Sequence, residues 1–219
     1  MQETIKNYVK KYTLGEEIAN SVTHGIGAAL SIAALTLLVT LASFQGDIWR
    51  IVSFSIYGST LFLLYISSTL YHSFQNEKVK KVFKIFDHSS IYLLIAGSYT
   101  PFLLVSMRST FGWILFITIW FLALSGIVFK AFFIFRFKRT STIIYVLMGW
   151  LSVIAMPEMI ENLHTSGITL LIAGGLTYSL GVIFYIWNKL PYNHAIWHLF
   201  VLGGSTLHFF AILYNVLPA

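Results

Sequence analysis

Three histidines lie within the segment 193–208 of this chain. His194 and His198 are four residues apart, so on a helix their side chains would point from one face, one turn apart. Two imidazoles at this spacing can bind one metal ion, as they do in helical zinc motifs. The chain has no cysteine, so His, Asp or Glu must complete any such site. The pair is informative only if its helix lies in a membrane, where an ionisable group is costly and usually functional.

The composition of the chain requires a membrane. Of the 219 residues, 57% are hydrophobic and only 10% are charged, whereas a soluble domain carries roughly a quarter charged residues. The apolar runs are long, and the short alternating segments of a transmembrane barrel are missing. We therefore expect an all-α integral membrane protein.

Seven apolar segments have the length of about twenty residues that a bilayer core demands. We place these spans at about 18–44, 49–74, 85–107, 111–133, 141–156, 167–187 and 193–217. No linker or repeat divides them, so residues 16–219 are predicted to form one seven-helix transmembrane bundle. In the preceding segment, 1–15, apolar residues recur at helical spacing and predict a short interfacial helix: Ile5, Tyr8, Val9 and Tyr12.

The basic residues predict the orientation of this bundle. If the N-terminus is cytoplasmic, the inner segments hold twelve of the fourteen Lys and Arg residues, and only Arg50 and Arg108 fall outside. This asymmetry indicates a cytoplasmic N-terminus and an outer C-terminus. It also accounts for the net charge of +6 without a nucleic-acid partner.

In this orientation, ionisable residues meet at one level in the inner leaflet. They end the second span and begin the third and seventh: His72, Asp87, His88, His194 and His198. Scattered core histidines would not share one depth, which favours a common site. The alternative is that they are interfacial residues that reach water or bond to packing neighbours, because polar groups are cheapest at helix ends.

A catalytic zinc ion usually has three protein ligands and one open position, and His72, His194 and His198 match that count. Ser68 lies one turn deeper than His72 on the same face. Asp87 could act as a ligand, orient a ligand or serve as general base. Because Ala195 stands where the metalloprotease motif has its glutamate, a base must come from another helix, and Asp87 is the candidate.

The other polar residues at this level have two interpretations each. His88 competes with Asp87, since adjacent helical residues point about 100° apart, and it could instead face the loop. Asp87 itself resembles a helix-start cap. One face of the first span carries three polar residues that either support the metal ligands or hold the helix in the bundle: Glu17, Asn20 and His24. His208 lies about 21 Å beyond His194, so we expect it to pack or to line a cavity above the metal.

Taken in order, these motifs resemble the hemolysin III family within the progestin and adipoQ receptor superfamily of seven-helix membrane proteins. The resemblance covers nearly the whole chain and rests on Glu17-x-x-Asn20-x-x-Thr23-His24, Ser68-x-x-x-His72, Asp87 with the segment 96–101, and His194-x-x-x-His198 followed by His208. It implies a zinc ion near the cytoplasmic side, bound by the three histidines of helices two and seven. It also implies that Asp87 and Ser68 flank the metal-bound water.

The resemblance also implies a location and a chemistry. The chain looks like the compact bacterial form, a multi-pass protein of the plasma membrane, rather than a hormone receptor. The family is distantly similar to alkaline ceramidases, which implies hydrolysis of a lipid amide or ester, with membrane lipids as partners and a role in membrane homeostasis. A non-enzymatic sensor of membrane state with structural zinc is the alternative. A pore-former, as the family name suggests, is poorly supported, because a secreted toxin needs a soluble state.

Overall fold

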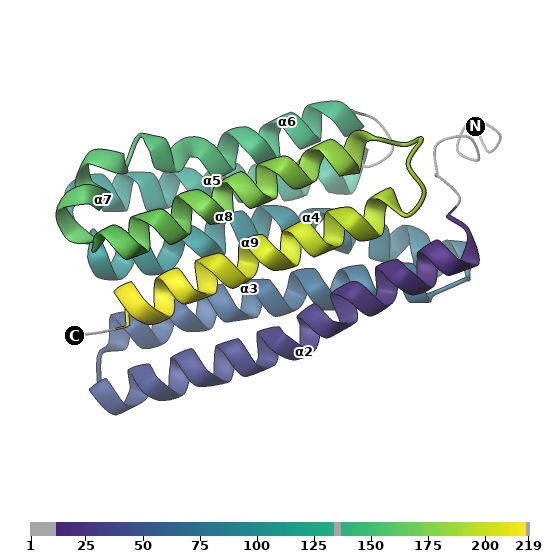
Figure 1. Cartoon of the computed structure of the whole chain (residues 1–219). Helices are drawn as coiled ribbons and strands as arrows, with labels where there is room; N and C mark the ends of the chain where they lie inside the picture. Colours follow the sequence, from purple (N-terminus) through teal and green to yellow (C-terminus); the bar gives the residue numbers. More distant parts are fainter. Residues whose placement is uncertain (1–11, 134–136, 218–219) are drawn as a thin grey trace.

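The computed structural model describes residues 12–133 and 137–217. These residues form helices and connecting turns only (Figure 1). The elements are α2 Leu14–Gln45, α3 Ile48–Ser73, α4 Glu77–Pro101, the π-helical turn η1 Phe102–Ser106, α5 Thr110–Phe133, α6 Lys138–Gly149, the 3-10 turn η2 Trp150–Val153, α7 Met156–Asn162, α8 Thr165–Ile186 and α9 Asn193–Asn215.

Six helices among the described residues are long and apolar enough to cross a membrane: α2, α3, α4 with η1, α5, α8 and α9. Thr140–Val153 and Met156–Asn162 pass the same test together but meet at an angle of 49°, so they add a seventh crossing if the bent pair counts as one span. The predicted all-helical membrane bundle is therefore confirmed, with six or seven candidate spans and a bend where the fifth was predicted.

The helices lie side by side along a common direction, and α2 packs against both α3 and α9 (Figure 1). The start of α2, the end of α3, the start of α4 and the start of α9 all lie at one end of the bundle, shown at the right of Figure 1. Large apolar side chains such as Phe44, Ile117 and Phe121 are exposed on the outside, where lipid would cover them. The core between the helices includes fully buried Tyr57 and Tyr92.

One predicted boundary is wrong at the start of α4. The charged segment 75–84 was predicted as a loop, but the helix begins at Glu77, where Asn76 accepts hydrogen bonds from the backbone N–H groups of Lys78 (3.0 Å) and Val79 (3.3 Å). Asn is a favoured N-cap residue, and lysines are compatible with an interfacial helix turn. Asp87 therefore lies in the third turn of α4 and does not cap its start, as the sequence had suggested.

Two other boundaries also move. Residues 157–166 were predicted as a loop, but α7 occupies Met156–Asn162, with Pro157 in its first turn, where proline is favoured. The first helix begins at Leu14 because Thr13 and Glu16 form a capping box, with the Thr13 N–H donating to Glu16 Oε2 at 2.9 Å. The predicted interfacial helix, apart from Tyr12, lies outside the described residues.

Close approach of α2 and α3 depends on Gly58. A Cβ atom added to Gly58 would lie 2.7 Å from the Cβ of Leu35 and 3.0 Å from its Cα, so the helix backbones would have to separate. We expect Gly58→Ala to lower the free energy of unfolding by about 1–3 kcal/mol, measured by thermal unfolding in detergent. Gly25→Ala is the matched control, because its Cβ would meet Thr69 at an ordinary 3.7 Å. Equal stability of the two variants would contradict this account of the helix contact.

The orientation of the bundle stays a prediction, and the lack of cysteines makes it simple to test. Lys81→Cys and Glu161→Cys each introduce one exposed thiol, near opposite ends of the bundle. With the N-terminus inside, a membrane-impermeant maleimide should label Glu161→Cys in intact cells and label Lys81→Cys only after lysis. The reverse pattern would show that the bundle is inverted.

Candidate metal centre

Three buried histidines meet near the end of the bundle where α2 and α9 begin. His72 lies in the last turn of α3, and His194 and His198 lie in the first two turns of α9. One ring nitrogen from each lies within 4.8 Å of the other two. The ring centroids are 4.5–5.4 Å apart. The structure thus brings together the three residues that the sequence proposed as ligands, in a group that could bind a metal ion.

The first of these histidines is oriented by α2. The Nδ1–H of His72 donates to Glu17 Oε2 at 2.6 Å, and the other oxygen of Glu17 pairs with Lys80. Since a carboxylate can only accept, this contact places the ring proton on Nδ1. The Nε2 atom of His72 is then a free acceptor, buried and without a hydrogen-bond partner. A carboxylate behind a histidine in this way fixes the ring and raises its basicity as a ligand.

The same helix orients a second histidine. His198 Nδ1 lies 3.1 Å from the backbone oxygen of Asn20 and 3.2 Å from Thr23 Oγ1. Donation from Nδ1–H to the carbonyl leaves Nε2 as the acceptor, as in His72. The contact of Thr23 was not anticipated, because the predicted polar face consisted of Glu17, Asn20 and His24. The α2 face carrying Glu17, Asn20 and Thr23 therefore lies directly behind the histidine group.

His24 lies flat against this group. Its ring stacks on that of His198 with centroids 3.4 Å apart and planes 11° from parallel. Both ring nitrogens of His24 are buried and have no hydrogen-bond partner. His24 is not one of the residues whose nitrogens converge, so its place is beside the ligands rather than among them.

Asp87 of α4 lines the same cavity as His194 and His198, and Ser68 lies one turn before His72 on α3. The buried Asp87 interacts electrostatically with His72 and His194. Its Oδ2 lies 3.1 Å from Nδ1 of His88, and both residues line the same cavity. The His88 ring turns toward the Asp87 carboxylate, and the expectation that only one of these neighbours faces the metal centre stays a prediction. Ser68 is fully buried, and its hydroxyl has no partner.

Three tyrosines pack against the histidine group. The Tyr12 ring stacks on His194 with centroids 5.3 Å apart and meets His72 edge-on at 5.6 Å. The Tyr71 ring lies 4.6 Å from His72, and Tyr185, which also lines a cavity inside the bundle, lies 5.9 Å from His194. No pattern in the sequence predicts these contacts, because Tyr12 belongs to the predicted interfacial helix and aromatic residues are common in membrane helices.

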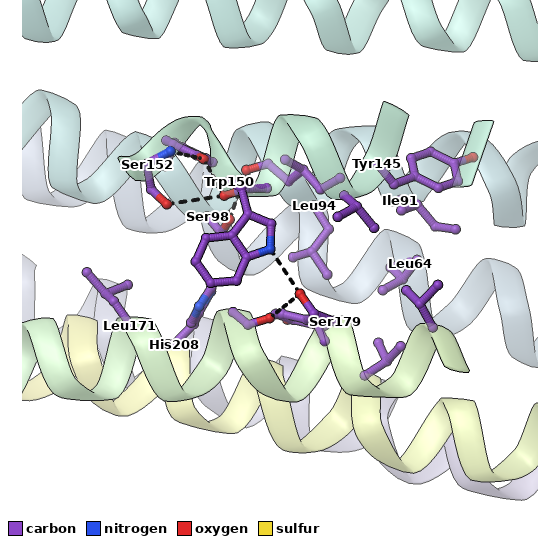
Figure 2. A pocket seen from close by; sticks show the side chains of 18 of the residues that line it. Leu64, Ile91, Leu94, Ser98, Tyr145, Trp150, Ser152, Leu171, Ser179 and His208 are labelled. Carbon is purple, nitrogen blue, oxygen red and sulfur yellow. Dashed lines mark hydrogen bonds between the residues drawn. The ribbon is translucent and has the colours of Figure 1, made fainter. Parts of the chain in front are cut away.

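A largely apolar cavity of about 190 Å³ extends from the histidine group along the inside of the bundle. His24, His194 and His198 line one end, and Met107 and Met156 line the other. His208 lines it further along α9, together with Trp150 and Leu171 (Figure 2). The cavity therefore connects the candidate metal centre with the region where the fifth span is broken.

Unsatisfied polar atoms concentrate at the histidine group. Buried polar atoms in proteins nearly always have a hydrogen-bond partner. Yet half of the described buried side-chain atoms without one belong to residues at this group or beside it: Asn20 Oδ1, His24 Nδ1 and Nε2, Ser68 Oγ, His72 Nε2. Free imidazole acceptors around a common point are what a metal ion requires, and a donor set of imidazoles suits zinc, copper, iron or nickel. The residues therefore fit a bound metal ion.

Comparison with known proteins places the chain in a family. The family model described as "Haemolysin-III related" matches residues 12–209. The chain belongs to this family. Among haemolysin-III relatives it is similar to Hemolysin-3 of Bacillus cereus, 57% identical over 93% of each chain. It also resembles the Hemolysin-3 homolog of Bacillus subtilis (strain 168), 53% identical over 93% of this chain and 95% of the relative.

A more distant relative extends the haemolysin-III likeness beyond bacteria. The human monocyte to macrophage differentiation factor is 33% identical, with 92% of this chain and 85% of the human protein covered. The bacterial relatives and the six or more long apolar helices together identify a multi-pass membrane protein. In a bacterial cell the plasma membrane is the location expected for it.

The contact between Glu17 and His72 gives a test of the centre that needs no activity assay. Glu17→Gln replaces the charged acceptor with an amide, so affinity for Zn²⁺ should fall by about 10–100-fold, measured by competition with a chromophoric chelator. Glu77→Gln is the control, because Glu77 is an exposed carboxylate in the first turn of α4. Unchanged affinity in Glu17→Gln would show that α2 does not support the ligand.

Proposed function

We propose that the protein is a zinc-dependent hydrolase of a lipid amide or ester and that it contributes to membrane homeostasis. The observation that carries the proposal is the position of the histidine group. It lies buried at one end of an apolar cavity that Asp87 also lines, and Ser68 lies one helical turn before His72 on α3. A soluble substrate would not need such a cavity, whereas a lipid chain would fill it while its polar end lies at the histidines.

Each residue at the centre has a separate task in this proposal. His72, His194 and His198 hold the zinc ion and leave one position open. Bound zinc would supply a Lewis acid that activates water and polarises a carbonyl. Asp87 accepts the proton from the attacking water and returns it to the leaving group. The Ser68 hydroxyl donates a hydrogen bond to the carbonyl oxygen as charge develops on it.

The surroundings support the same chemistry. Tyr12, Tyr71 and Tyr185 pack against the buried histidine group, and the cavity beside it is largely apolar. Electrostatic interactions of Asp87 are stronger in such a medium than in water. Glu17 and the Asn20 carbonyl hold two ligand rings in place before substrate enters, which removes their reorganisation from the reaction.

A second candidate is a non-enzymatic sensor of membrane state, in which zinc is a structural clamp. It is favoured by the origin of the ligands, since His72 belongs to α3 whereas His194 and His198 belong to α9. A metal ion there would tie the second and last of the described spanning helices together, and α2 to both of them. This candidate assigns no proton transfer to Asp87.

The printed names of the bacterial relatives raise a third possibility, a haemolytic pore. Large apolar side chains are exposed along the spans, and only 10% of the residues are charged. A protein with this surface has no soluble state from which to attack another membrane. We therefore propose a resident membrane protein, and finding it folded in culture fluid would argue against this.

Two variants distinguish the proposed hydrolase from the sensor in which zinc is a structural clamp. His194→Ala should lose stoichiometric zinc and lipid turnover together. Asp87→Asn should keep the zinc but lower turnover by about 10²–10⁴-fold, the usual contribution of a general base. Zinc content is measured on purified protein, and turnover by mass spectrometry of a total lipid extract incubated with it.

The Asp87→Asn variant can also be tested in cells by complementation. In a deletion strain, membrane fluidity should be restored by the wild-type gene and not by Asp87→Asn. Restoration by Asp87→Asn would support the clamp. A wild-type protein that binds zinc stoichiometrically but turns over no lipid in any extract would contradict the proposed hydrolase activity.

A further inference from the structure

His208 stands apart from the metal centre as an unsatisfied polar group in an apolar cavity. Both of its ring nitrogens are buried, and neither has a hydrogen-bond partner among the described residues. The carbonyl of Leu171 lies nearby, but it forms no hydrogen bond of acceptable geometry with the ring. The residue lines the cavity from α9, and Figure 2 shows it directed into the same part of the cavity as Trp150.

The other polar side chains around His208 already have partners. The Trp150 indole N–H donates to Ser179 Oγ at 3.0 Å (Figure 2). The Tyr178 hydroxyl lies 2.8 Å from Ser205 Oγ, and its ring meets that of His208 edge-on with centroids 5.4 Å apart. His208 therefore differs from the other described residues that line the cavity away from the histidine group. Both of its ring nitrogens are buried, and neither forms a hydrogen bond.

The position of the ring is built into the packing of α8 on α9. A Cβ atom added to Gly174 would lie 2.3 Å from Cδ2 and 2.6 Å from Nε2 of His208. Only glycine leaves room for the imidazole against α8. The bundle therefore accommodates a histidine here although two unpaired nitrogens are buried. This burial lowers the stability of the fold by at least the contribution of one hydrogen bond.

We propose that His208 binds a hydroxyl group on a lipid chain lying in the cavity. An uncharged imidazole offers one donor and one acceptor, and a hydroxyl offers the same pair. Away from the histidine group the lining is largely apolar and suits methylene groups, and among the described lining residues there the buried polar atoms without a partner are the two ring nitrogens of His208. The ligand class is thus a long-chain lipid with a single oxygen function well along the chain.

The position of that hydroxyl follows from the distance along α9, and here the inference rests on the proposed function. His208 is ten residues beyond His198, or about 15 Å along the helix. If the carboxyl or carbonyl end of the lipid lies at the histidine group, about the twelfth carbon of the chain lies at His208, because each single bond of about 1.5 Å advances an extended zigzag chain by only about 1.25 Å. A hydroxyl close to the carbonyl end would not reach it.

The test measures binding of three free acids to zinc-loaded, detergent-solubilised protein by native mass spectrometry. The probes are 12-hydroxyoctadecanoic, 2-hydroxyoctadecanoic and unsubstituted octadecanoic acid. Wild type should bind the 12-hydroxy acid about fivefold more tightly than the other two, the worth of one added hydrogen bond. His208→Phe should abolish this preference without weakening octadecanoic acid, and His208→Gln, which keeps a donor and an acceptor, should retain part of it.

Ser98→Ala is the matched control, because Ser98 lines the cavity but already donates to the Ile95 carbonyl at 2.8 Å. It should keep the full preference. Equal binding of all three acids by wild type, or a preference that survives in His208→Phe, would overturn the proposal. Since free acids have no bond to hydrolyse, a protein that shows the preference but turns over no lipid would refute the hydrolase and leave the hydroxyl site standing.

Discussion

Buried histidines need partners for their nitrogens, and α2 supplies these partners from one side only. Glu17 accepts from His72, and the Asn20 carbonyl accepts from His198. Each contact fixes the proton on Nδ1 and leaves Nε2 available. The rest of the centre depends on this asymmetry, because rings bonded on both sides could not bind a metal ion, and rings bonded on neither would not keep one orientation.

The level of the site along the membrane could be predicted from the sequence. Depth follows from counting residues along a helix, so His72 and His194 could be placed together once the spans and their order were known. The start of α4 could not be placed as well, because the lysines of 75–84 indicated a loop more strongly than Asn76 indicated a cap. Asp87 nevertheless lies at the expected level. Only the start of α4 was misplaced, and this does not change the position of Asp87 relative to the rest of the helix.

What the sequence could not supply was rotation about the helix axes and the directions of side chains. The turn of the His88 ring toward Asp87 depends on the rotamers of both residues. The stacking of His24 on His198 depends on how α2 and α9 pack. Tyr12 lies over the histidines because Thr13 is extended and α2 begins only at Leu14, whereas the sequence pattern placed Tyr12 in a helix of its own. These details come from packing, which is settled between segments far apart in the sequence.

The division of the centre among α2, α3 and α9 has a consequence for how the protein is made. A chain that has inserted only α2 and α3 carries Glu17 and His72 but lacks the other two histidines of the group. Those two belong to α9, more than one hundred residues later in the sequence. The histidine group is therefore complete only once the last of the described helices has packed, and a chain interrupted before α9 would lack two of its three imidazoles.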